Sequence, residues 1–263
     1  VPEEGWLPTM VPGAPAGWAA LNARFGTKPL SELFAPAISY AENGYAVPVN
    51  VGKLWARDSK RIARVMAQDP APYEYWWKSF MKPDGSPYRA GDVFRFPAYA
   101  DTMCSLAETN CESYYRGELM ERIVAHSRPT GGYFCEDDFK NYHPEWVEPI
   151  TQDYRGYTVC EIPPNGHGIT VLMALGMLNG LTLPEQREDA DYYHKVMEAI
   201  KLAFADTKTY VADPRYMKTK VSELLSPDYL AARRALITDK ALEPKAGDPH
   251  CGGTIYLCTA DRE

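Results

Sequence analysis

The sequence contains no run of about 18 consecutive apolar residues, the minimum for a membrane-spanning helix. It also lacks CxxC pairs, a phosphate-binding P-loop and histidine or cysteine residues at zinc-binding spacing, so we expect neither a metal nor another cofactor. Long runs of like charge are missing, and the formal net charge is −7 at pH 7. These absences argue against a membrane-spanning segment in this chain and against nucleic acid as a partner.

The composition of the 263 residues is that of a globular protein, with 45% hydrophobic and 24% charged residues. This length suits one large domain or two small ones. The chain begins at Val1 without an initiator methionine or a leader, and it ends at Glu263, where we expect a strand to turn back. We therefore expect a piece of a longer protein. Its compartment is left open between the cytoplasm and the periplasm or cell exterior.

Six cysteines lie along the chain without the density of a disulfide scaffold. Cys104 and Cys111 fall in one predicted helical stretch, where seven residues correspond to a rise of about 10.5 Å. A disulfide tolerates a Cα separation of only roughly 7 Å. We therefore predict that both are buried thiols, which favours a reducing compartment.

Apolar residues at helical spacing predict a mostly helical chain with a few strands. Pro15 suits a first helical turn, Gly26 and Gly44 suit helix ends, and Ser226 suits a helix N-cap. The predicted helices cover residues 15–25, 30–43, 49–68, 71–81, 98–110, 112–126, 136–142, 169–179, 191–213 and 226–237. The predicted strands cover residues 146–151 and 157–162.

Two further features precede the end of the chain. The loop over residues 163–168 enters a helix whose first amides suit an anion, and His167 lies in this loop. The long helix from residue 191 carries one apolar face, formed by Val196, Ile200, Ala203, Phe204, Thr207 and Val211. Residues 238–251 are polar and contain two prolines, and we predict a poorly ordered linker there.

The chemistry of the chain is concentrated in residues 251–261. Gly252 and Gly253 precede Thr254, which opens an apolar, strand-like run that ends at Asp261. Because glycine has no Cβ, the bond before Thr254 can be held in a strained geometry that is open to attack. A cut there gives Thr254 both a hydroxyl nucleophile and an α-amine base. Taken alone, these residues are more often a Gly-Gly turn before an ordinary edge strand.

Separate segments of the chain nevertheless occur in an order that is typical of one family. They are residues 34–38, 131–134, 146–150, 153–157, 198–206 and 253–254. In residue type and order they resemble the γ-glutamyltransferase (γ-glutamyltranspeptidase) family of N-terminal-nucleophile hydrolases. The resemblance covers nearly the whole chain.

This resemblance implies an α+β class, four-layer αββα fold, to which the chain contributes helices and a few strands. It implies that residues 1–253 are the later part of the large (α) subunit and that residues 254–263 are the first strand of the small (β) subunit. The precursor is expected to cut itself between Gly253 and Thr254. The partners are then the remaining segments of the same precursor, in an αβ heterodimer or a dimer of such heterodimers.

The implied activity is γ-glutamyl transfer or hydrolysis, with a glutathione-like donor and with water or an amine as acceptor. Thr254 is the implied nucleophile, and its α-amine is the implied general base. Ile255 and Tyr256 stand where the family commonly has a threonine and a histidine. Three alternatives therefore stay open: a β-lactam (cephalosporin-type) acylase, a poly-γ-glutamate-processing enzyme and an inactive scaffold. The oxyanion donors and substrate-binding residues are implied to lie outside this chain.

Overall fold

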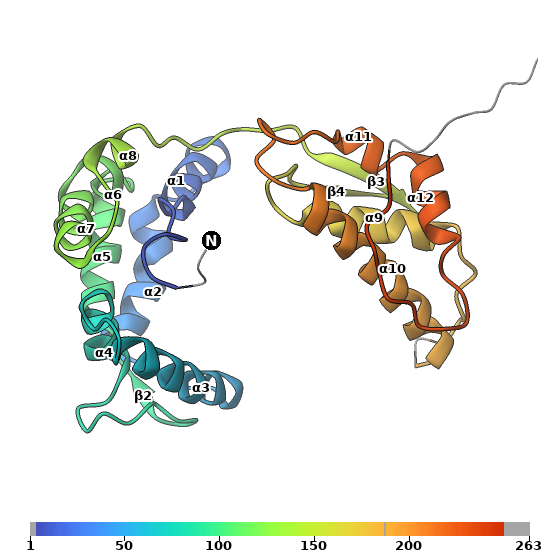
Figure 1. Cartoon of the computed structure of the whole chain (residues 1–263). Helices are drawn as coiled ribbons and strands as arrows, with labels where there is room; N and C mark the ends of the chain where they lie inside the picture. Colours follow the sequence, from blue (N-terminus) through green and yellow to red (C-terminus); the bar gives the residue numbers. More distant parts are fainter. Residues whose placement is uncertain (1–3, 187, 250–263) are drawn as a thin grey trace, which may run out of the picture. The chain divides into compact units, whose positions relative to one another are not determined.

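A computed structural model describes residues 4–186 and 188–249 and divides the chain into two compact units (Figure 1). The first unit is Val1–Glu145 and the second is Trp146–Glu263. The sequence patterns did not predict this division. Each unit has its own helices, a two-stranded sheet and at least one cluster of buried apolar side chains.

The first unit is mainly helical, and proline and glycine set its first boundaries. Its elements are α1 (Ala14–Phe25), α2 (Leu30–Asn43), β1 (Tyr45–Ala46), α3 (Val49–Met66), the 3₁₀ helix η1 (Ala71–Tyr73), α4 (Glu74–Phe80), β2 (Val93–Phe94), α5 (Pro97–Glu108), α6 (Ser113–Arg116), α7 (Glu118–Ser127), the 3₁₀ helix η2 (Arg128–Thr130) and α8 (Glu136–Lys140). Pro15 occupies the first turn of α1, as predicted. Gly44 ends α2 with φ +84, where a Cβ would lie 2.7 Å from the Val93 side chain.

Two clusters of buried side chains form the core of the first unit. In one cluster, Leu30 at the start of α2 packs with Met103 and Leu106 of α5. The other contains Tyr115 of α6, Met120 and Val124 of α7, and Phe139 of α8. The short strands β1 and β2 pair antiparallel, with Tyr45 opposite Phe94.

Three predictions for this unit need correction. The helix expected over residues 112–126 is divided into α6 and α7 by Gly117, whose backbone is extended. Cys111 lies beyond the end of α5 with φ +67, so it does not share a helix with Cys104. Cys104 is only half-buried, whereas Cys111 is buried as expected, and neither forms a disulfide.

The second unit consists of a hairpin followed by helices. Its elements are β3 (Ile150–Tyr154), β4 (Tyr157–Glu161), α9 (Gly168–Asn179), α10 (Ala190–Tyr210), α11 (Val221–Leu224) and α12 (Pro227–Arg234). Strands β3 and β4 pair antiparallel with Tyr154 opposite Tyr157. Arg155 and Gly156 link them with φ values of 50 and 85, which suits a tight two-residue hairpin turn. Ser226 caps α12 by accepting a hydrogen bond from the Tyr229 amide, as predicted.

Helix α9 is the centre of the second unit's core. Nearly all of its residues are apolar, and Ile169, Met173 and Met177 have no exposed surface. A helix that is apolar all round needs cover on most of its sides, although Val171 of α9 is exposed. Here α10 covers it with Leu202 and α12 covers it with Leu230, and β3 also lies against it.

The predicted α+β class is confirmed. Helices dominate both units, and the strands described here form two separate two-stranded sheets. None of the helices in residues 4–186 and 188–249 is long and apolar enough to cross a membrane.

The burial of Cys111 gives a test of the first unit. Burial raises the pKa of its thiol to about 11, so the reactive thiolate is a very minor form near neutral pH. We expect iodoacetamide to alkylate the exposed Cys135 and Cys160 in the native protein and to alkylate Cys111 only after unfolding. Peptide mass spectrometry reads each site separately. Equal labelling of Cys111 and Cys135 in the native protein would contradict this packing.

Candidate functional site

The residues expected to carry the chemistry, Gly253 and Thr254, lie outside the described residues, as does the nearby His250. The structure therefore describes the chain up to Pro249, and the arrangement of Thr254 stays a prediction. What the structure does describe is the segment that leads to this threonine, from Thr238 to Pro249.

This segment is attached to α10, which corrects the prediction of a poorly ordered linker over residues 238–251 for the part that is described. The Leu242 amide donates to Glu198 Oε2 at 3.2 Å, and the Gly247 amide donates to Asp206 Oδ1 at 2.8 Å. Both carboxylates belong to α10 and are buried, with 2% and 0% exposure. In Figure 1 the segment runs along α10 after the chain leaves α12.

Asp206 also forms a buried ion pair with Arg233 of α12. The Arg233 Nε atom donates to Asp206 Oδ2 at 2.9 Å, and the two side chains are only 6% and 0% exposed. The Arg233 Nη2 atom donates to the Lys245 carbonyl at 2.6 Å. One carboxylate and one guanidinium therefore satisfy each other and two backbone groups of the segment. A buried pair requires such additional hydrogen bonds to offset the cost of removing both charges from water.

Gly247 fits closely into the space beside this pair. A Cβ at this position would lie 2.6 Å from the Tyr229 hydroxyl and 2.8 Å from Arg233 Cδ. The Tyr210 hydroxyl donates a hydrogen bond to the Gly247 carbonyl. The absence of a side chain at Gly247 thus permits the close approach of the backbone to α10 and α12.

The electrostatics of the two carboxylates differ. Burial raises the pKa of Asp206, although the Gly247 amide and Arg233 act in the opposite direction. Burial also acts to raise the pKa of Glu198. The hydrogen bonds from Lys201 and from the Leu242 amide outweigh this effect, so the pKa of Glu198 is lowered. Asp206 is therefore the more desolvated of the two, and hydrogen bonds to it are formed where water competes least.

The sequence patterns did not identify Glu198 and Asp206. The face of α10 predicted to be buried included Phe204, which is 44% exposed, whereas both carboxylates are buried. A signal was present in the sequence. Glu198, Leu202 and Asp206 are four residues apart and share one helical face, and a carboxylate on an apolar face requires a partner.

The loop over residues 163–168 leads into α9, and the side chain of Glu161 lies at the start of this helix. A Cβ on Gly168 would lie 2.5 Å from Glu161 Oε2, so this side chain lies against the helix N-terminus. A carboxylate there interacts favourably with the helix dipole. His167 is exposed at the N-cap of α9 and makes no side-chain capping bond there. An anion bound at these amides, as predicted, would therefore have to compete with the carboxylate of Glu161.

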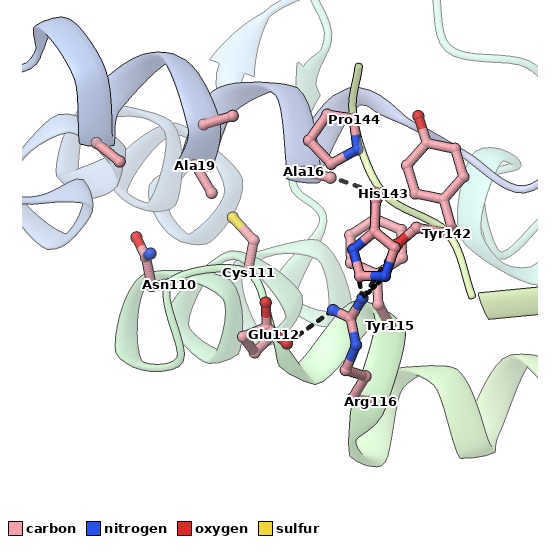
Figure 2. A pocket seen from close by; sticks show the side chains of 12 residues that line it. Ala16, Ala19, Asn110, Cys111, Glu112, Tyr115, Arg116, Tyr142, His143 and Pro144 are labelled. Atoms are coloured by element: carbon pink, nitrogen blue, oxygen red, sulfur yellow. Dashed lines mark hydrogen bonds and ion pairs between the residues drawn. The ribbon is translucent and has the colours of Figure 1, made fainter. Parts of the chain in front are cut away.

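The first unit contains a pocket of about 240 Å³ between α1 and α6, shown in Figure 2. The Arg116 guanidinium donates to Glu112 at 2.9 Å and to the Tyr142 carbonyl at 3.1 Å, and it lies 3.1 Å from His143 Nδ1. These internal partners already use the positive charge. No group of three metal-ligating side chains lies together in residues 4–186 and 188–249.

Comparisons with known proteins identify relatives over the whole chain. A family model described as Gamma-glutamyltranspeptidase matches residues 1–263. The chain is 32% identical over 254 residues to the glutathione hydrolase-like YwrD proenzyme of Bacillus subtilis, covering 96% of this chain and 46% of that protein. This chain thus spans about half the length of the curated relatives it matches.

Solved structures agree. The crystal structure of cephalosporin acylase from Bacillus halodurans matches with a TM-score of 0.86 at 44% identity, covering 95% of this chain and 46% of that one. The γ-glutamyltranspeptidase of Helicobacter pylori matches with a TM-score of 0.81 at 27% identity, covering 96% of this chain and 72% of that one.

The ion pair between Asp206 and Arg233 gives a stability prediction. Asp206→Ala leaves the Arg233 charge buried without its carboxylate, so we expect the free energy of unfolding to fall by about 3–5 kcal/mol. Asp191→Ala is the matched control, because Asp191 is exposed on the same helix and pairs with Lys195 at the surface. It should cost less than about 1 kcal/mol. Urea unfolding of the full-length protein measures both, and equal losses would contradict the described burial.

Proposed function

Because the chain belongs to the γ-glutamyltranspeptidase family, we propose that it forms part of a self-cleaving enzyme that transfers or hydrolyses γ-glutamyl groups. The observation that carries this proposal is a Gly-Gly-Thr sequence at residues 252–254, inside a chain that the family model matches from residue 1 to residue 263. We assign residues 1–253 to the later part of the large subunit and residues 254–263 to the start of the small subunit.

The proposed activation step is an attack of Thr254 on its own chain. The Thr254 hydroxyl oxygen attacks the Gly253 carbonyl carbon, the peptide C–N bond breaks, and an ester forms between the two residues. Water then hydrolyses the ester, which leaves a carboxylate on Gly253 and a free α-amine on Thr254. The name "proenzyme" of the Bacillus subtilis relative supports an activation of this kind.

Turnover uses the same hydroxyl. The α-amine of Thr254, with a reference pKa of about 7.7–8.0, accepts the hydroxyl proton near neutral pH. The oxygen attacks the γ-carbonyl carbon of the donor, the donor's amine leaves with a proton, and a γ-glutamyl ester remains. Water or an acceptor amine then releases the γ-glutamyl group. We expect the oxyanion donors and the groups that hold the substrate to come from the rest of the precursor.

Glutathione-like amides are the proposed donors, supported by the name of the glutathione hydrolase-like relative. An acylase is a second candidate function, because the match to the cephalosporin acylase structure has 44% identity. A donor that lacks the α-amino group separates the γ-glutamyl function from other acyl-amide functions. A γ-glutamyl donor has an α-amino group, whereas the glutaryl group of a glutaryl amide lacks it.

Self-cleavage is the first test. The full-length protein should separate into two fragments on a denaturing gel, and the amino terminus of the smaller one should read Thr-Ile-Tyr-Leu. Thr254→Ala removes the hydroxyl and should abolish cleavage. Thr254→Ser keeps a hydroxyl and should still cleave. A wild-type protein that stays intact after long incubation would refute the proposed enzyme and favour the inactive scaffold.

The donor is the second test. For the cleaved enzyme we expect kcat/KM to be at least about tenfold higher with γ-glutamyl-p-nitroanilide than with glutaryl-p-nitroanilide. Tenfold corresponds to about 1.4 kcal/mol, less than the usual cost of leaving a charged binding partner unpaired. Release of p-nitroaniline measures both rates. A preference for the glutaryl substrate would favour the acylase instead.

A further inference from the structure

The segment that leads to the proposed cleavage bond lies along α10 in a fixed register. Glu198 and Asp206 are two helical turns apart on one face, a rise of about 12 Å. They accept hydrogen bonds from the amides of Leu242 and Gly247, and a chain of five residues spans at most about 18 Å. The segment therefore runs in the same direction as α10 and is more than half extended between the two bonds.

The register is fixed most firmly at residues 245–247. Three polar groups of the backbone are bound by side chains: the Lys245 carbonyl by Arg233, the Gly247 amide by Asp206 and the Gly247 carbonyl by Tyr210. These side chains come from two different helices, α10 and α12. The closeness of Tyr229 and Arg233 to Gly247 leaves no room for a Cβ, so the backbone and its surroundings are complementary in shape as well as in hydrogen bonding.

This attachment lies only a few residues before the bond that is proposed to be cut. Gly253 follows Gly247 by six residues, Leu242 by eleven and Arg234, the last residue of α12, by nineteen. The hydrogen bonds at Leu242, Lys245 and Gly247 are attachments of the described chain that lie close to this bond in the sequence, and their loss moves the last held position further from it.

We propose that Asp206, Arg233 and Tyr210 are positioning residues for self-cleavage, which hold Gly247 so that the bond between Gly253 and Thr254 is delivered in a limited volume. The inference rests on the proposed function. None of the three side chains takes part in bond making or breaking. They act through the backbone of residues 245–247, by fixing the place from which the chain continues towards the bond.

Gly247→Val tests the proposal without removing a buried charge. A Cβ here would lie less than 3 Å from Tyr229 and Arg233, so we expect the new side chain to displace the segment, while Asp206 and Arg233 themselves are not replaced. The full-length protein is made by cell-free synthesis with a radioactive label, and the conversion of precursor to fragments is followed on a denaturing gel. We expect conversion to slow at least about twofold, and to slow further when Glu198→Ala is added.

Two control variants separate positioning from general instability. Gly17→Val makes the same substitution in α1, where a Cβ meets no atom within 4 Å. Leu224→Ala weakens the core of the second unit, but its side chain makes none of the three hydrogen bonds to the segment. Both should be cleaved at the wild-type rate. The fraction of Gly247→Val that has been cleaved should have a kcat within about twofold of the wild-type value, because its bond is already cut.

The outcomes are distinct. Cleavage of Gly247→Val at the wild-type rate overturns the inference and leaves the proposed function standing. Equal slowing of Leu224→Ala and Gly247→Val at equal loss of thermal stability also overturns it, because stability would then explain both. An uncleaved wild-type precursor refutes the proposed function, and the inference fails with it.

Discussion

The buried ion pair between Asp206 and Arg233 is the interaction on which the second unit's organisation depends. It joins α10 to α12, and its remaining hydrogen-bonding capacity is used by the backbone of residues 245–247. Two charges in a dry environment are stabilising only when all of their hydrogen-bonding groups are satisfied. The segment supplies those partners, so the fold of the helices and the course of the chain towards Thr254 are determined together.

This coupling gives the helices a role in chemistry that takes place elsewhere. Both α10 and α12 pack against the apolar residues of α9, and the pair of Asp206 and Arg233 is buried beside this core. A rigid pair then holds Gly247, six residues before the proposed cleavage bond. The core of the second unit is thus connected to the nucleophile through the backbone.

The N-terminal-nucleophile hydrolase fold predicted from the sequence is confirmed by the structural matches to a cephalosporin acylase and a γ-glutamyltranspeptidase.

Local chemistry in the sequence predicted much of the fold. Pro15, Gly44 and Ser226 set helix ends through their own backbone or side-chain preferences, whereas the strand expected over residues 146–151 lies further along the chain, at Ile150–Tyr154. These features depend on neighbours within a few residues. The division of the expected helix at Gly117 was missed, although glycine is a weak helix former, because the apolar spacing continues on both sides.

The attachment of the final segment could not be predicted in the same way. The partners of Asp206 are 27 and 41 residues away in the sequence, at Arg233 and Gly247, and residues 238–249 have the polar, proline-containing composition of a free linker. Only the three-dimensional arrangement shows that buried side chains satisfy this backbone. Of the candidate site, the sequence provided Gly253 and Thr254, which stay predictions, while the structure provided the residues that hold the chain leading to them.

The most direct test of the account is covalent labelling of the full-length protein with a γ-glutamyl-like diazoketone, followed by digestion with trypsin and peptide mass spectrometry. The account predicts a labelled peptide that begins at Thr254, ends at Arg262 and carries the adduct on the threonine hydroxyl. Such a peptide reports both the cut before Thr254 and the identity of the nucleophile. An unlabelled peptide that continues unbroken through Gly253 and Thr254, or an adduct on another residue, would contradict it.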